Sequence, residues 1–146
     1  MSLYLIFEQT LKKQTPEPII PENSSNEIVI NPKGERVLRF DLGQDLLYEV
    51  MLNFRSNNPI TSNFSKHFNR TIKKYESKEL MEFYKEVKKE FSEGGIEFIH
   101  KATDGASLQY PKDFNIEKQF TKNMTDFEYF VKFSIDNQLT IKHVLA

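Results

Sequence analysis

One stretch of the sequence, from Lys33 to Leu46, offers the clearest candidate for recognition chemistry. Within it, Gly34 and Gly43 enclose four charged residues: Glu35, Arg36, Arg39 and Asp41. An arginine presents five donors in a rigid plane, which suits the carboxylates or backbone carbonyls of a partner protein. The same stretch is also typical of nothing more than the start of a hairpin followed by the start of a helix. From the chemistry alone, this second interpretation is favoured over an exposed arginine fork.

Motifs for catalysis or for metal binding do not occur in the sequence. The three histidines lie far apart, at His67, His100 and His143, so no pair has metal-ligand spacing on a helix. The absence of cysteine excludes a disulfide, a cysteine zinc site and a thiol nucleophile. A serine nucleophile elbow and a phosphate-binding loop are missing too. We therefore expect no enzyme, no metal and no cofactor, although a serine, carboxylate or lysine site stays open.

Length and charge narrow the class of protein further. The chain has 146 residues, the size of one domain, and its 13 Phe and 6 Tyr can build one core. A net charge of −1 argues against general nucleic-acid binding, which needs a basic surface. The apolar run between Met1 and Glu8 lacks a positive flank and is too short for a signal or membrane segment. We expect a cytoplasmic protein that does not insert into a membrane and has no small-molecule substrate.

The N-terminal part divides into a segment and a linker ahead of one domain. Residues 3–12 can form a helix or a strand, and periodicity does not decide between them. Residues 15–25 contain three prolines, which forbid a helix and predict a linker or an extended arm. We therefore expect residues 1–25 to form an N-terminal segment with a Pro-rich linker, and residues 26–146 to form a single α+β domain.

The first half of that domain combines a hairpin with helices. Residues 27–30 and 37–42 favour strands, and residues 31–34 have the composition of a turn. Asp45 is a plausible N-cap for a helix over residues 46–54, although the same residues also alternate as a strand would. Two more helices are predicted, one from Thr61 or Ser62 to Tyr75 and one over residues 78–91, which Gly94 and Gly95 would end.

The C-terminal part is predicted to be β-structure. Short strands are expected over residues 96–100 and 108–110, separated by a turn at residues 104–105. Residues 127–135 alternate most regularly and predict the clearest strand, with a turn at residues 136–138 and a hairpin partner over residues 139–145. The fold class is then α+β, a small antiparallel sheet packed against two or three helices. If either strand of this C-terminal hairpin lies at a sheet edge, a partner strand can add to it; the alternative is that both strands pair internally.

The stretch after the first turn resembles the baseplate-wedge family of contractile phage tails. That family includes the type VI secretion component TssE and is sometimes called lysozyme-like. Its signature matches here in spacing at Gly34, Glu35, Arg36, Asp41, Gly43 and Leu46. Asn31, Phe40 and Leu42 replace the family's Thr, Pro and aromatic residue. Glu76 matches a later aromatic-Glu-Pro-Arg motif, whereas Ser77 and Lys78 depart from it. Residues 130–135, Phe-Val-Lys-Phe-Ser-Ile, resemble the closing strand of the family.

The resemblance implies a structural subunit of a contractile injection machine, placed where the baseplate meets the sheath. The partners of such a subunit would be other baseplate and sheath proteins. The resemblance leaves open whether the machine is a phage tail or a secretion system. The residues carried over as partner-binding are Gly34, Glu35, Arg36, Arg39, Asp41, Gly43 and Glu76. The main alternative is a stand-alone inhibitor, such as an immunity protein or antitoxin that binds a cognate toxin. A cell-wall hydrolase is a further alternative, suggested only by the older family name.

Overall fold

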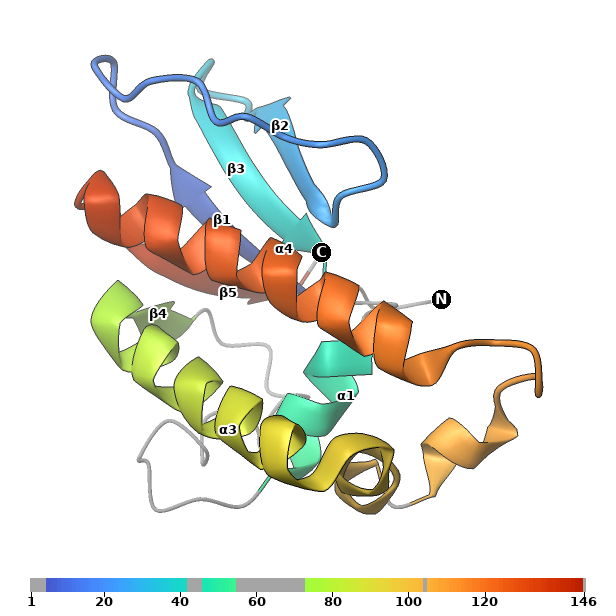
Figure 1. Ribbon diagram of the computed structural model, residues 1–146. Coiled ribbons are helices and arrows are strands. Elements are labelled where there is room, and N and C mark those ends of the chain that lie inside the picture. The colour runs from blue at the N-terminus through green and yellow to red at the C-terminus, as the bar shows by residue number, and fades with distance from the viewer. Residues whose placement is uncertain (1–4, 42–45, 55–72, 104, 146) are drawn as a thin grey trace.

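A computed structural model of the chain describes residues 5–41, 46–54, 73–103 and 105–145. Five strands form one sheet in the order β2-β3-β1-β5-β4, and all neighbours are antiparallel (Figure 1). The strands are β1 (Leu5–Thr10), β2 (Asn26–Ile30), β3 (Arg36–Asp41), β4 (Lys73–Tyr75) and β5 (Ile141–Leu145). The helices are α1 (Leu46–Asn53), α3 (Ser77–Ala102) and α4 (Ile116–Asp136), with a short 3-10 helix, η1 (Ala106–Gln109). The predicted α+β class is confirmed.

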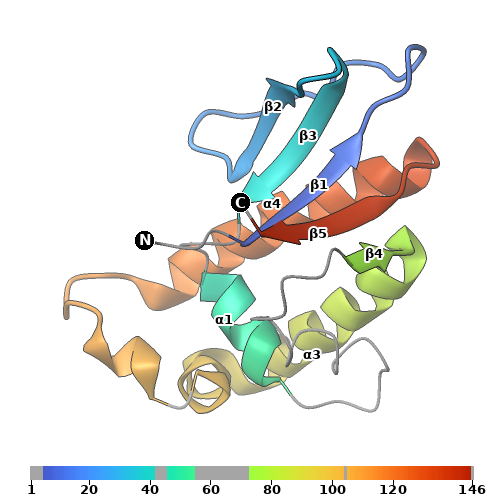
Figure 2. The same ribbon diagram turned by 180° about the vertical axis from the view of Figure 1, so that it is seen from behind.

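The described helices lie on one face of the sheet (Figures 1 and 2). Helix α4 lies across β2 and β3 and also packs against α3 and α1. Phe7, Phe40, Phe127 and Phe130 are fully buried where this helix meets the strands. The aromatic rings of Phe40 and Phe127 lie edge to face, with centroids 5.3 Å apart. One aromatic core between the helices and the sheet therefore organises the described part of the chain.

The hairpin formed by β2 and β3 follows the prediction closely. The strands pair from Asn26↔Phe40 to Ile30↔Arg36. Gly34 takes a left-handed φ of 79°, which a glycine adopts without steric cost. Its N–H donates to the carbonyl of Asn31 at 2.9 Å, which closes the turn. The turn at residues 31–34 is therefore confirmed, as are the two strands beside it.

The segment near the N-terminus is a strand in the middle of the sheet. β1 pairs with β3 along Ile6↔Asp41 to Thr10↔Val37, and with β5 on its other side. Phe7 and Gln9 point into the core and are fully buried. The sheet thus includes residues 5–10, which the sequence placed ahead of the domain. The stretch between β1 and β2, residues 11–25, contains no helix or strand, as its prolines predict.

The first predicted helix is confirmed as α1, and its competing strand interpretation is wrong. Leu46, Leu47, Val50 and Met51 are buried at the i, i+1, i+4, i+5 spacing of one helical face. The proposed N-cap, Asp45, lies outside the described residues. Most of the next predicted helix, over residues 61–75, lies outside them as well. Its expected last residues, however, form strand β4.

Helix α3 confirms the prediction up to its glycines and corrects it beyond them. Gly95 has φ 57° and ψ −140°, so the first helical segment ends there. A second helical segment then continues to Ala102, where a strand over residues 96–100 was expected. That strand is wrong because Ile99 and Ala102 are buried three residues apart on one helical face. Residues 108–110, also expected as a strand, follow a left-handed Gly105 and fall largely within η1.

The largest correction concerns residues 127–135, which belong to helix α4 and not to a strand. The buried residues of this helix recur at helical spacing: Phe120, Asn123, Met124, Phe127, Phe130, Val131 and Ser134. Large side chains on several faces, such as Tyr129 and Phe133, mimic strand alternation within a short window. The side chain of Asn115 accepts from the N–H of Lys118 at 2.9 Å and caps the helix.

Strand β5 is confirmed as a strand but has different partners from those predicted. It lies between β1 and β4 and so cannot be the hairpin partner of residues 127–135. The turn at residues 136–138 is the end of α4, where the N–H of Asn137 donates to the carbonyl of Phe133 at 3.1 Å. Because β5 is an inner strand, its backbone is not available for strand addition, and the interpretation of it as a sheet edge is wrong. The edges of the sheet are β2 and β4.

Candidate protein-interaction site

The turn between β2 and β3 is held by its own side chains. The side-chain oxygen of Asn31 accepts from the N–H groups of Lys33 and Glu35, at 3.0 and 2.9 Å. Its amide nitrogen donates to the Glu35 carboxylate at 3.1 Å. Asparagine at the first position of a turn mimics a further backbone turn in this way. Gly34 and Glu35, both expected to bind a partner, therefore have a structural role in the hairpin.

Arg36 is directed at its own chain and clamps the stretch that follows β1. Its guanidinium donates to the carbonyls of Lys12 and Thr15, at 2.8 and 3.0 Å. The same group lies 2.6 Å from the Glu17 carboxylate. The side chain of Arg36 is only 26% exposed. The exposed fork, the less favoured of the two interpretations, is wrong for this residue, because its donors already bind carbonyls and a carboxylate of the same molecule.

Arg39 lies three residues further along β3, on the face of the sheet opposite the described helices. Its Nε is 3.3 Å from the Glu8 carboxylate, and the two side chains face each other across paired strands. Both remain partly exposed, at 33% and 22%. Such a pair adds little stability, but it places charge in the centre of a face that no described helix covers.

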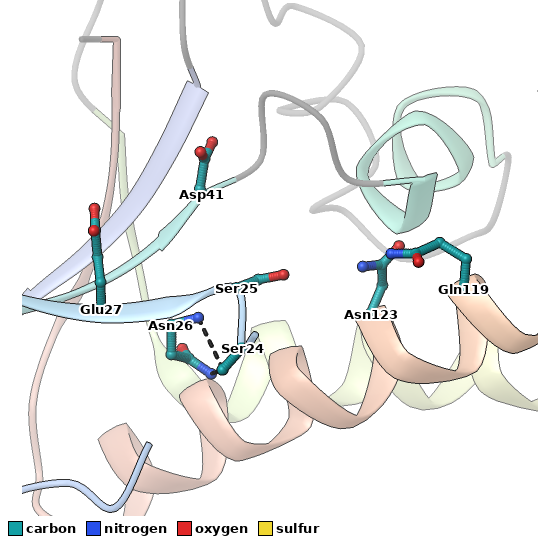
Figure 3. A pocket seen from close by; sticks show the side chains of 7 residues that line it. All are labelled: Ser24, Ser25, Asn26, Glu27, Asp41, Gln119 and Asn123. Atoms are coloured by element: carbon teal, nitrogen blue, oxygen red, sulfur yellow. Dashed lines mark hydrogen bonds between the residues drawn. The ribbon is translucent and has the colours of Figure 1, made fainter. Parts of the chain in front are cut away.

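Asp41 ends β3 and borders a polar pocket beside the start of β2. The pocket has a volume of about 270 Å³, and Figure 3 shows the side chains around it. It is lined by Ser24, Ser25, Asn26, Glu27, Asp41, Gln119 and Asn123. Hydroxyls, amides and carboxylates line it without an aromatic or aliphatic wall. Such a lining suits a polar or cationic group more than an apolar ligand. Gly43, the next motif residue, lies outside the described residues.

Asn26 fastens the start of β2 to helix α4. Its amide donates to the carbonyl of Asp126 at 2.9 Å, and its own N–H donates to the Ser24 hydroxyl at 3.0 Å. The Asp126 carboxylate in turn accepts from the N–H of Ser25 at 3.0 Å. On the same helix, the side-chain oxygen of Asn123 accepts from the N–H of Leu46 at 3.2 Å. These contacts make the beginning of β2 a rigid, pre-ordered edge.

Glu76 lies away from the other motif residues. It is the N-cap residue of α3, directly after β4, at the far end of the sheet from β2. It is exposed, its side chain does not cap the helix, and it borders a second pocket of about 420 Å³. The structure thus brings Gly34, Glu35, Arg36 and Arg39 together on one hairpin, places Asp41 at its other end, and separates Glu76 from them.

Sequence reasoning missed the most accessible apolar residues around this hairpin. Ile19 is 83% exposed in the stretch before β2, and Ile30 is 63% exposed at the end of β2. The N–H of Ile19 donates to the Tyr129 hydroxyl of α4 at 2.8 Å, which leaves the isoleucine side chain facing outward. The only signal in the sequence was the Ile-Val-Ile run of β2, which predicts a strand but not an edge.

Three buried tyrosines dominate the electrostatics of the interior. Burial raises the pKa of Tyr48, Tyr75 and Tyr84 well above the ordinary value of 10.0. The neighbouring Tyr75 raises the pKa of Tyr48 further, and the Glu128 carboxylate does the same for Tyr84. The Tyr84 hydroxyl donates to Glu128 at 3.0 Å and lies 3.2 Å from the carbonyl of Met124. These phenols are protonated parts of the core across the neutral range.

Neither a metal centre nor a membrane segment is visible within residues 5–41, 46–54, 73–103 and 105–145. No three histidine or acidic side chains gather there in an arrangement that could hold a metal ion. None of the helices in these ranges combines the length and apolar character needed to cross a membrane. The candidate site within these ranges is the β2–β3 hairpin with the polar pocket at its base.

Comparison of the chain with protein-family models, with curated proteins and with solved structures found no match.

Proposed function

We propose that this protein works by binding other proteins, as a structural baseplate subunit of a contractile injection system in the cytoplasm. The observation that supports this proposal is the hairpin itself. The residues that carry the family resemblance, Gly34 to Arg39, build one rigid β2–β3 unit at the edge of the sheet. Around it lie the exposed Ile19 and Ile30. A pre-ordered surface of this kind binds a partner without a large cost in ordering.

The clamped stretch between β1 and β2 adds to this surface. Arg36 and Glu17 hold it against the hairpin, and Tyr129 holds it against α4. Most motif residues then act by positioning a surface, and they need not contact the partner themselves. This division of roles suits a subunit that needs a stable core and an available edge and carries out no reaction.

Capture from the native cell tests this proposal. The full chain, tagged and expressed at its normal level, is cross-linked in the cell, purified, and its partners are identified by mass spectrometry. Recovery of sheath and baseplate proteins is the expected result. A control bait carries Lys101→Glu, a change on an exposed residue of α3 away from the hairpin, and is expected to recover the same partners.

Recovery of one toxin in place of sheath proteins would support the alternative, an inhibitor that binds a cognate toxin. The charge on β2 favours that alternative next, because the exposed Glu27 has no ion pair among the described residues, which suits a basic toxin. Clearing of peptidoglycan by the pure protein, lost on substitution of a single Asp or Glu, would instead indicate a hydrolase and overturn both binding proposals.

A further inference from the structure

The geometry of β2 points to the way in which a partner is held. We infer that the free edge of β2 accepts an extended strand of a partner protein that carries Lys or Arg across from Glu27 and apolar residues across from Ile28 and Ile30. This inference rests on the proposed function, since it names the partner chemistry of the same surface. Three features of the described residues carry it: the unused backbone groups of β2, the lack of edge protection, and the charge along the strand.

The first feature is the backbone of β2, half of which faces away from β3. The N–H of Asp41 donates to the carbonyl of Ser25 at 3.2 Å, and the N–H of Asn31 donates to the carbonyl of Glu35 at 2.9 Å. Hydrogen-bonded pairs alternate along an antiparallel ladder, so Glu27 and Val29 also bond to β3. Ile28 and Ile30 must therefore direct their N–H and C=O groups outward. Among the described residues, nothing hydrogen-bonds to these outward groups.

The second feature is a contrast between the two edges of the sheet. β4 has only three residues, of which Lys74 is exposed, and short edges bearing lysine are the usual protection against strand addition. β2 has five residues without a lysine or proline, and its Ile30 side chain is 63% exposed. The hydrogen bonds of Asn26 to Ser24 and Asp126 keep this edge straight at its start. β2 is thus the edge that can template another strand.

The third feature is charge. The stretch from residue 14 to residue 32 contains Glu17, Glu22 and Glu27 and no Lys or Arg. Arg36 pairs with Glu17. Arg39 lies across from Glu27 on β3 but pairs with Glu8, so the exposed Glu27 has no ion pair among the described residues. Asn26 and Ile28 point to the helices, so Glu27 lies on the opposite face. A basic residue directly across from Glu27 would form a close, non-hydrogen-bonded pair with it.

The same charges argue against a second copy of this chain as the occupant. Two β2 strands paired with each other would bring together two strands that each carry Glu27 and contain no Lys or Arg. Like charges that face each other across strands are destabilising. A strand of a different protein, basic where this edge is acidic, is favoured instead.

A displayed library of seven-residue extended peptides, screened against the full chain, tests the inference. Alternate positions are randomised, so that basic, acidic and apolar strands compete. We expect the enriched peptides to share a Lys or Arg at the position that pairs with Glu27, with apolar residues among the other randomised positions. In titrations of the labelled protein with a synthetic copy of one such peptide, we expect the amide signals of Ile28 and Ile30 to move most.

Matched variants then locate the contact. Ile30→Pro removes an outward N–H and leaves the ladder to β3 intact, and proline is tolerated at such edge positions. We expect it to bind the enriched peptide about tenfold more weakly or worse, the loss expected when about 1.4 kcal/mol of binding is removed. Ile30→Val keeps the N–H and is expected to bind like the native chain. Glu27→Lys is expected to weaken basic peptides by about as much as the proline does.

Several results would overturn the inference. One is enrichment of acidic or helical peptides, and another is that Ile30→Pro binds the enriched peptide as tightly as the native chain does. A third is that the peptide shifts amide signals of the native chain away from β2. This third readout does not depend on how well a variant folds. Dimerisation of the free protein that Ile30→Pro abolishes would make a second copy the occupant, against the inference. If native partners are captured but bind Ile30→Pro equally, this inference fails and the proposed function stands. If basic peptides bind β2 but no partner is captured in the cell, the proposed function fails instead.

Discussion

At the scale of single residues, Arg36 shows how a motif that suggests recognition can serve the fold. Its guanidinium spans two carbonyls of the stretch after β1 and the carboxylate of Glu17. The sequence left two interpretations open, a hairpin start and an exposed fork. The arginine belongs to the first, because its donors are satisfied within the chain.

Replacing Arg36 by alanine is expected to destabilise the protein by about 1–2 kcal/mol, since hydrogen bonds to backbone carbonyls and a partly exposed ion pair are lost. Urea unfolding measures the loss. Limited proteolysis should show faster cleavage within residues 12–20, which Arg36 holds. Lys33→Ala, on the same hairpin but exposed, is the matched control and should leave both readouts unchanged. Equal stability and equal cleavage of the Arg36 variant would mean that the clamp does not form.

The buried tyrosines predict how stability depends on pH. Burial raises the pKa of Tyr84, and so does Glu128, so the folded chain holds the phenol proton more tightly than the unfolded chain. The stabilisation is fully present below pH ~10 and is lost as the pH rises above that value. Between roughly pH 10 and 11, Tyr84→Phe should therefore make the fall of the unfolding free energy with rising pH less steep, by about 1 kcal/mol per pH unit. Urea unfolding across that range tests this, and an unchanged slope would contradict it.

At the scale of elements, the predictions failed where a local pattern was compatible with two periods. Residues 27–30 and 37–42 alternate and are separated by turn residues, so their hairpin could be predicted. Residues 127–135 alternate as well, but they continue a helical stripe that begins at Phe120. Only a longer window, with the N-cap Asn115 at its start, separates the two. The sequence pattern did not predict this helix because its aromatic residues lie on more than one of its faces.

Two substitutions in α4 distinguish its helical face from strand alternation. Phe130 is fully buried, and Phe130→Ala is expected to cost about 3–5 kcal/mol in urea unfolding. Tyr129 is only half-buried, and Tyr129→Ala should cost about 1 kcal/mol, mainly through the lost hydrogen bond from Ile19. A strand with residues 127, 129 and 131 on its buried face would reverse this order. Equal or reversed costs would therefore contradict the helix.

The kink in α3 depends on the backbone of Gly95. Its φ of 57° with ψ of −140° is a conformation that side chains strongly disfavour, although a Cβ there would touch nothing within 4 Å. Gly95→Ala is therefore expected to cost about 1–3 kcal/mol through the backbone alone. Glu93→Ala, two residues earlier and exposed, should stay within about 0.5 kcal/mol of the native chain. A Gly95 variant as stable as the native chain would show that the helix can straighten.

At the scale of the whole molecule, the strand order decides what is available to a partner. The sequence indicated the α+β class and most of the candidate hairpin, because both depend on short-range patterns. It could not indicate that β5 lies between β1 and β4, or that β2 is the outer strand, because strand order depends on contacts between distant residues. The candidate binding edge was therefore assigned to the wrong end of the chain. Glu76, carried over from a later motif of the resembled family, lies at the opposite edge of the sheet from the hairpin.

Amide hydrogen exchange on β2, in the isolated chain and in complex with the captured partner, tests most directly whether partners bind through this strand. In the isolated chain, the amides of Glu27 and Val29 should be protected by β3, whereas those of Ile28 and Ile30 should exchange quickly. In the complex, we predict that Ile28 and Ile30 become protected as well, so that the alternation disappears. Amides of Ile28 and Ile30 that exchange as quickly in the complex as in the isolated chain would contradict binding at this edge.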